Sequence, residues 1–124
     1  MKKIESAKAP AAVGPYSQAI ATENLVFLSG QLGINQATGA MEAGVEAQTR
    51  QAFQNIQYVL SEANLTLENV VKVTVYLADI NDFAAVNAIY AEQFSQPYPA
   101  RSAFQVAALP LGGLVEIEVI ASQE

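Results

Sequence analysis

The chain contains no cysteine and no histidine. Without cysteine it has no disulfide, no thiolate nucleophile and no thiolate metal ligand. Without histidine it lacks the usual general base near neutral pH and the commonest metal ligand. These absences argue against a zinc site and exclude nucleophilic catalysis of the Ser-His or Cys-His type. Proton transfer is left to carboxylates, tyrosines, lysines or bound water.

Positive charge is also scarce, with six lysines and arginines against twelve acidic residues and a formal net charge of -6. Nucleic-acid binders usually carry a basic stripe that displaces counterions from phosphate, so this balance argues against a nucleic-acid partner. No apolar run reaches the roughly 18 residues that span a bilayer. The N-terminus also lacks the apolar segment of a signal peptide. We therefore expect a cytoplasmic protein.

The composition and the hydrophobic pattern predict one α/β domain over residues 1–124. The chain is 52% hydrophobic and 15% charged, and no repeat or linker divides it. Periodicity predicts a hairpin, a helix, a buried strand, a second helix and two closing strands. These elements are expected at residues 17–29, 45–63, 70–78, 81–96, 101–107 and 114–121. This order is typical of an α/β sandwich in which two helices cover one face of a mixed sheet.

Local signals refine the two helices. Glu46 and Arg50 stand four residues apart and are expected to pair on the exposed side of the first helix. Asn64 suits the left-handed position that closes this helix. Asn81 is expected to cap the second helix, with Ile80 as a hydrophobic staple.

The strand at residues 70–78 predicts self-association. Val71, Val73, Val75 and Leu77 are expected on one face, and Val70, Thr74 and Tyr76 on the other. Both sets are largely apolar, and apolar runs of this kind indicate burial on both faces. Two helices can cover only one face, so the other is expected to meet another subunit of a homo-oligomer.

Arg101 is the first candidate for a functional residue. It opens the apolar stretch 103–109 in a chain that has few cations. A guanidinium at the start of a buried strand needs a partner. That partner is a carboxylate of the protein, either Glu116, Glu118 or an acid from another chain, or it is the carboxylate of a ligand, which the planar guanidinium can bind bidentately.

Glu116 and Glu118 alternate with Val115, Ile117 and Val119, so both carboxylates are expected on one face of the last strand. That face is either simply solvated, or one of the carboxylates orients a water or takes a proton.

Four further positions carry weaker signals. Asn87 lies within the apolar stripe of the second helix and either ties the helix to a loop or lines a pocket. Tyr16 follows Gly14-Pro15 in a loop. Ser29-Gly30 ends a strand, where a glycine allows a ligand to approach the backbone closely.

Together these residues resemble the reactive-intermediate deaminase family, also called the Rid or YjgF family. The resemblance runs nearly end to end. It rests on residues 9–19 with Gly14-Pro15-Tyr16, on 27–32 with Ser29-Gly30-Gln31, on 81–90, and on Pro99-Ala100-Arg101-Ser102 with Val115-Glu116-Ile117-Glu118.

The resemblance implies a chorismate-mutase-like fold, in which a six-stranded mixed sheet has two helices on one face. It also implies that three subunits pack through their sheets into a homotrimer with clefts between subunits. The activity it implies is hydrolysis of 2-imino acids and their enamine tautomers, including 2-iminobutanoate and 2-iminopropanoate, to 2-keto acids and ammonia. No cofactor, metal, nucleic acid or membrane is implied.

The family's residue roles carry over by position. Arg101 would hold the substrate carboxylate and Glu116 would position the attacking water. The cleft would be lined by Tyr16, Ser29, Gly30, Asn87, Tyr90 and Ala103. Ala103 departs from the family, because many members have cysteine there. The thiol is not a required nucleophile in the implied mechanism, so we expect activity to survive.

Two other functions remain open at this point. One is a regulatory protein that binds 2-keto acids in the same cleft without turnover. The other is the ribonuclease or translation-inhibitor role once attached to some members, against which the acidic charge and the lack of histidine argue.

Overall fold

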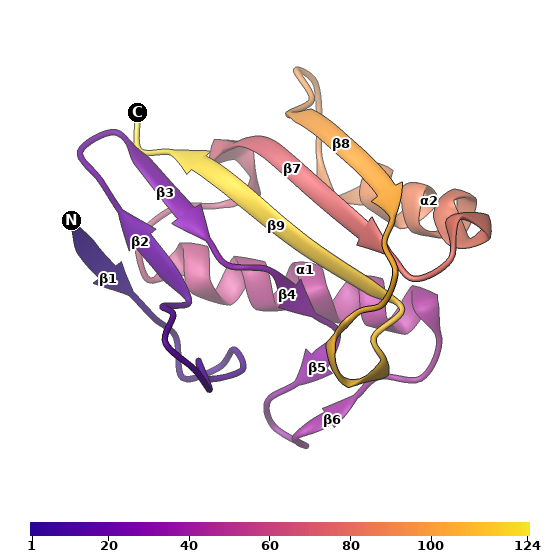
Figure 1. The fold of residues 1–124 in the computed structure, drawn as a ribbon. Helices are drawn as coiled ribbons and strands as arrows, with labels where there is room; N and C mark the ends of the chain where they lie inside the picture. The colour runs from indigo at the N-terminus through magenta and orange to yellow at the C-terminus, as the bar shows by residue number, and fades with distance from the viewer.

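The computed structural model describes all residues, 1–124, as one mixed sheet with two helices on one of its faces (Figure 1). The order across the sheet is β1-β2-β3-β9-β7-β8, and β4 pairs with β9 beyond the end of β3. Only the β7–β8 pair is parallel. The main-sheet strands are β1 (Lys2–Ile4), β2 (Ala19–Ala21), β3 (Leu25–Leu28), β4 (Gln31–Leu32), β7 (Val70–Leu77), β8 (Ala100–Gln105) and β9 (Val115–Ser122). This architecture confirms the predicted fold class.

The remaining elements connect these strands. They are the hairpin of β5 (Ile34–Asn35) and β6 (Ala40–Met41), the helices α1 (Val45–Ser61) and α2 (Phe83–Gln93), and the 3-10 turns η1 (Leu67–Asn69), η2 (Ile80–Asp82) and η3 (Pro110–Gly112). Neither helix combines the length and the apolar character needed to cross a membrane.

The core lies between the sheet and the helices. Alternate residues of β9 and β7 are buried there, and Glu116 and Glu118 point to the opposite, open face of the sheet. Helix α1 meets the sheet with the predicted stripe, which includes Phe53 and Ile56. Asn64 has φ 60° and follows α1, as predicted.

Two buried amides of α1 hold the chain around β4 and β9. The Asn55 side chain donates to the carbonyls of Leu32 and Ile34, at 3.2 and 2.9 Å. The Gln48 side chain accepts from the Leu114 N–H at 2.8 Å and donates to the Glu42 carbonyl at 3.0 Å. Buried amides need such partners, and here the partners are the backbone on both sides of the candidate site.

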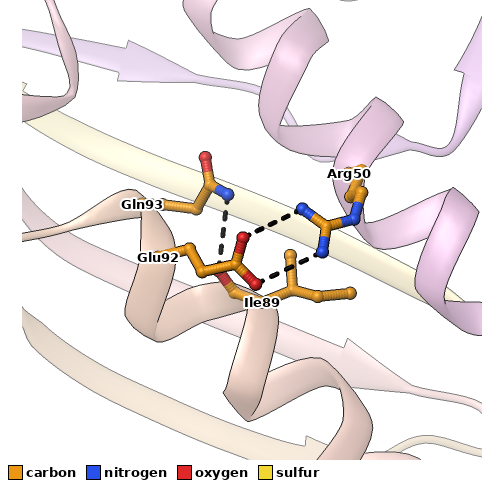
Figure 2. A network of polar contacts seen from close by, with 4 residues as sticks. All are labelled: Arg50, Ile89, Glu92 and Gln93. Carbon is orange, nitrogen blue, oxygen red and sulfur yellow. Dashed lines mark hydrogen bonds and ion pairs between the residues drawn. The ribbon is translucent and has the colours of Figure 1, made fainter.

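The expected pair of Glu46 and Arg50 is wrong. Arg50 instead binds Glu92 of α2 with two hydrogen bonds, at 3.1 and 3.2 Å (Figure 2). The pair joins the two helices on their exposed sides. Glu92 accepts from both terminal nitrogens of the Arg50 guanidinium, so its bidentate contact is favoured over a pair with Glu46 four residues earlier on the same helix.

The expected start of the second helix is also wrong. Asn81 lies in η2, where the Asp79 side chain accepts from the Asn81 N–H at 2.9 Å. Helix α2 begins at Phe83 without a side-chain cap. Ile80 is exposed and forms no staple. Asp79, two residues before Asn81, supplies the capping oxygen. The first helical turn therefore begins at Ile80, before the predicted cap residue.

Two expectations about burial fail in the sheet. A register shift between Val70 and Lys72 along β9 turns Val70 into the core and leaves Val71 exposed, which reverses the predicted faces at this end of β7. Strand β8, expected to be buried, is largely exposed. It is an edge strand with β7 as its single neighbour.

The open face of the sheet carries exposed aromatic rings. Phe27 and Phe104 are 42% and 45% exposed, and the Phe104 ring packs edge-on against Tyr76 at 5.5 Å. Such a patch is the kind of surface that another subunit covers. Self-association through this face remains a prediction.

We predict that Gly33→Ala lowers the free energy of unfolding by about 2 kcal/mol, because the added methyl overpacks the core. The new Cβ would lie 2.4 Å from Cα of Gln48, in the backbone of α1, which cannot move aside locally. Urea denaturation at one protein concentration measures the change. Gly14→Ala is the matched control, since its Cβ would meet the Tyr16 ring at an ordinary 3.7 Å. Equal midpoints for the two variants would contradict this packing argument.

Candidate functional site

A cavity of about 730 Å³ opens beside β4. The N-terminal loop, the end of β3, the β5–β6 hairpin and the loop before β9 surround it. Of the predicted site residues, it gathers Tyr16, Ser29, Gly30 and Glu116, and Glu118 lines it as well. Asn87, Tyr90, Arg101 and Ala103 lie elsewhere.

The break between β3 and β4 shapes the base of this cavity. Phe27 of β3 pairs with Ile120, and Leu32 of β4 pairs with Glu116. The chain therefore advances five residues from Phe27 to Leu32 where β9 advances only four. The extra residue is a bulge at Ser29-Gly30. A Cβ on Gly30 would lie 2.8 Å from Cδ of Glu116. Glycine at this position therefore leaves room for the Glu116 carboxylate to lie over the backbone.

The two carboxylates of β9 differ in their partners. Glu118 accepts a hydrogen bond of 2.5 Å from the Tyr76 hydroxyl, and this bond raises the pKa of Tyr76 to about 12. Glu116 accepts no hydrogen bond within the chain. Burial, and then the neighbouring charge of Glu118, raise the pKa of Glu116 above that of an ordinary glutamic acid. Of the two carboxylates, Glu116 is thus the one without a hydrogen-bond partner in the chain.

Buried Gln18 holds the N-terminal loop that carries Tyr16. Its amide donates to the carbonyls of Ser6 and Pro10, at 3.2 and 2.9 Å, and its oxygen accepts from the Ser6 N–H at 2.7 Å. The Ser29 hydroxyl donates to the Ser17 carbonyl at 2.6 Å, which ties the same loop to the bulge. Tyr16 is half-exposed beside the cavity.

The second group of predicted residues surrounds Arg101. Its Nη1 donates to Oδ1 of Asn87 at 2.6 Å. The guanidinium lies over the rings of Tyr90 and Phe83, with its Cζ 4.6 and 5.4 Å from their centroids. Contacts of this geometry hold a cation without neutralising it. Arg101 forms no ion pair within the chain, so the internal salt bridge that the sequence left open is absent.

Tyr90 and Ala103 lie next to this arginine. Tyr90 is buried, its hydroxyl has no hydrogen-bond partner, and burial raises its pKa while the charge of Arg101 opposes the shift. Ala103 lies two residues after Arg101 on the same face of β8 and packs against the core. Asn87 ties α2 to β8 and does not line the cavity at Glu116.

The two groups lie on opposite faces of the sheet. Arg101 pairs with Val73, whose side chain faces the helices, and Glu116 pairs with Tyr76 on the open face. Residues paired across adjacent strands project to the same side. Arg101 and Glu116 of one chain therefore do not meet in a common cleft.

Sequence reasoning missed three contributors. Phe83 fits the apolar stripe of the second helix, and nothing in that pattern indicates that its ring lies under Arg101. Gln18 gives no signal beyond being a polar residue near a strand. Leu111 lies in a turn between two strands and lines the cavity with Pro110. No group of three or more acidic side chains converges as a metal site would require.

Comparisons with known proteins find close relatives along almost the whole chain. The model of the endoribonuclease L-PSP family matches residues 6–123. A 2-iminobutanoate/2-iminopropanoate deaminase of Capra hircus is 54% identical over 121 residues, which cover 97% of this chain and 88% of the relative.

Two solved structures share the fold. RidA from an Antarctic Psychrobacter bacterium is 48% identical and superposes with a TM-score of 0.95, covering 98% of this chain and 99% of that one. TdcF of E. coli with bound serine is 38% identical, with a TM-score of 0.96 and full coverage of both chains. The chain therefore belongs to the endoribonuclease L-PSP family, which includes the YjgF and RidA proteins that its motifs resemble.

Proposed function

We propose that the protein hydrolyses 2-imino acids and their enamine tautomers, such as 2-iminobutanoate and 2-iminopropanoate, to 2-keto acids and ammonia. The observation that carries the proposal is the state of Arg101, a cation held by an amide and two aromatic rings with no carboxylate partner. A 2-imino acid supplies such a carboxylate. Relatives from several mammals, about half identical over nearly the full length, are 2-iminobutanoate/2-iminopropanoate deaminases.

Arg101 is proposed to bind the substrate carboxylate with its planar guanidinium. The Asn87 oxygen occupies one nitrogen of the group at 2.6 Å. The other donors remain available for a bidentate contact. The rings of Phe83 and Tyr90 under the guanidinium and the Asn87 hydrogen bond restrict its movement, so little conformational entropy is lost when the substrate binds.

Glu116 is proposed to activate water. Its carboxylate lies over Gly30, free of hydrogen bonds to the chain. Water attacks the imine carbon while Glu116 takes one of its protons. Glu116 then returns the proton to the nitrogen, which gives the neutral tetrahedral adduct. It next takes the proton of the adduct's hydroxyl group and passes it to the same nitrogen, so that the C–N bond breaks, the C=O bond of the 2-keto acid forms and ammonia leaves. Imines hydrolyse without a catalyst, so positioning and this one proton relay suffice, and no cofactor is needed.

The complete site is proposed to form between subunits of a homotrimer. Arg101 and Glu116 lie on opposite faces of one sheet, so one chain cannot bring both to a small substrate. A neighbouring copy that covers the open face, with its exposed Phe27 and Phe104, could bring its own Arg101 to the cavity at Glu116. The bound serine of TdcF supports an amino-acid-sized ligand. We place this activity in the cytoplasm.

We predict that the protein lowers semicarbazone formation when threonine dehydratase releases its imine in the presence of semicarbazide. Arg101→Lys should reduce this activity on the order of 100-fold, because an ammonium does not reproduce the planar fork. Normal folding of the variant is checked by circular dichroism. If the protein binds 2-ketobutyrate yet does not accelerate hydrolysis, it is a binding protein. Cleavage of RNA instead would favour a ribonuclease.

A mixture of two inactive variants tests where the site forms. Arg101→Ala and Glu116→Gln are each expected to be nearly inactive, and unfolding and refolding them together at equal amounts should restore activity. Each cleft between copies draws its arginine and its glutamate from different chains, so random mixing leaves about a quarter of the clefts intact. A mixture as inactive as its parents would place both groups in one chain or remove one of them from the reaction.

The pH dependence of the rate tests the role of Glu116. It accepts a proton only when ionised, so the rate should fall as pH drops through its pKa, which burial and Glu118 raise. Glu118→Gln removes a like charge, lowers that pKa and should shift the acid limb to lower pH. Glu68→Gln, in η1 and outside the cavity lining, should leave the acid limb of the pH profile unchanged. A limb that does not move in Glu118→Gln would contradict the assignment.

A further inference from the structure

We propose that Leu111, together with Val13, is the specificity-determining wall of the cavity, and selects imino acids with extended apolar side chains. This inference rests on the proposed function, because it concerns which substrate the same cavity prefers. Neither residue has a role in the chemistry described above.

Leu111 has an unusual backbone and an unusual exposure. Its φ and ψ are 57° and 26°, in the left-handed region, and its side chain is 79% exposed. Left-handed backbone disfavours any residue with a branched carbon chain, and glycine is the residue that adopts it freely. Gly112, the next residue, also has positive φ. The turn therefore carries a large apolar side chain where glycine would be more stable.

The exposure of Leu111 does not reflect a loose loop. The Gly113 N–H donates to the Pro110 carbonyl at 3.0 Å, and the Leu114 N–H donates to the buried Gln48 side chain at 2.8 Å. Gly113 lies against the core side of the cavity, since a Cβ there would come within 2.8 Å of Leu32. The turn is closed by its own hydrogen bond and is tied to α1 at its C-terminal end, and Leu111 forms part of the cavity lining.

Apolar residues also line the cavity from the N-terminal loop. Val13 is 91% exposed, and Pro10 and Ala11 lie near it in the lining. The polar groups of the cavity include Glu116 and Glu118 on β9 and Ser29 at the bulge between β3 and β4. An apolar region that adjoins carboxylates suits a ligand with a polar reacting end and an apolar side chain.

The charge of the lining excludes one class of substrate. No lysine or arginine lines the cavity, whereas Glu116 and Glu118 both do. The Arg101 that a neighbouring copy is proposed to bring to the cavity pairs with the substrate's own carboxylate. An acidic side chain would add a second carboxylate, for which the lining offers no further cation. Imino acids derived from glutamate or aspartate should therefore be poor substrates.

A series of imines tests this inference. An amino-acid oxidase generates them from alanine, 2-aminobutyrate, norvaline, norleucine and glutamate in the presence of semicarbazide. For the unaltered protein, kcat/KM should rise about four-fold with each methylene of the substrate side chain that Leu111 covers, because burying a methylene is favourable by an amount that corresponds to this factor. The imine from glutamate should be the poorest substrate.

Leu111→Ser should lose about ten-fold or more in kcat/KM with the norleucine imine and change little with the alanine imine. Leu111→Gly should show the same loss of selectivity and unfold at a temperature no lower than the parent, because glycine adopts the left-handed backbone without strain. Ile80→Ser, an exposed apolar residue in η2 away from the cavity, is the control and should keep the parent's selectivity.

The outcomes separate this inference from the proposed function. Failure of the unaltered protein to accelerate hydrolysis of any imine would overturn the function itself. Turnover of the short imines with no gain along the series, or an equal loss for every imine in Leu111→Ser, would overturn the role of Leu111 alone. Loss of the oligomer in Leu111→Ser, measured by size-exclusion chromatography, would assign Leu111 to a subunit contact and also overturn it.

Discussion

The arrangement of this protein depends on the two-residue side-chain period of the central strand β9. Val115, Ile117 and Val119 must enter the core that α1 and α2 cover, so Glu116 and Glu118 are forced to the open face. The same constraint acts through β7 on the edge strand, where Arg101 faces α2. This register places the Arg101 guanidinium and the Glu116 carboxylate on opposite faces of the sheet. The separation is the physical basis for the proposed site between copies.

Local departures from regular structure adapt each half of this arrangement. The bulge at Ser29-Gly30 lets the Glu116 carboxylate lie over a backbone without a side chain. On the other face, Asn87 and the rings of Phe83 and Tyr90 hold the Arg101 guanidinium without neutralising it. Neither half relies on an ion pair. Each group therefore keeps its charge available for a ligand. For Glu116 this arrangement has a cost, because its partly buried carboxylate accepts no hydrogen bond and burial raises its pKa.

Much of the fold was predictable because its signals are local. The stripe of α1, the left-handed Asn64 and the alternation of β9 depend on spacing alone, and the structure has all three. The failures involve competition between distant groups. Arg50 had two carboxylates within reach and binds the one on α2, and a bulge against β9 reversed the faces at the start of β7. Spacing along one segment contains no information about such partners.

By itself the sequence determined the α/β class, the absence of histidine and cysteine chemistry, the shared face of the two glutamates and the motifs that place the chain in its family. Those properties follow from composition and from the periods of helices and strands. Only the tertiary structure decided that Arg101 rests on Phe83, Tyr90 and Asn87, that Glu118 is bound by Tyr76 while Glu116 is free, and that the candidate residues divide between two faces. These depend on strand order and register, which are set by contacts between residues far apart in the chain.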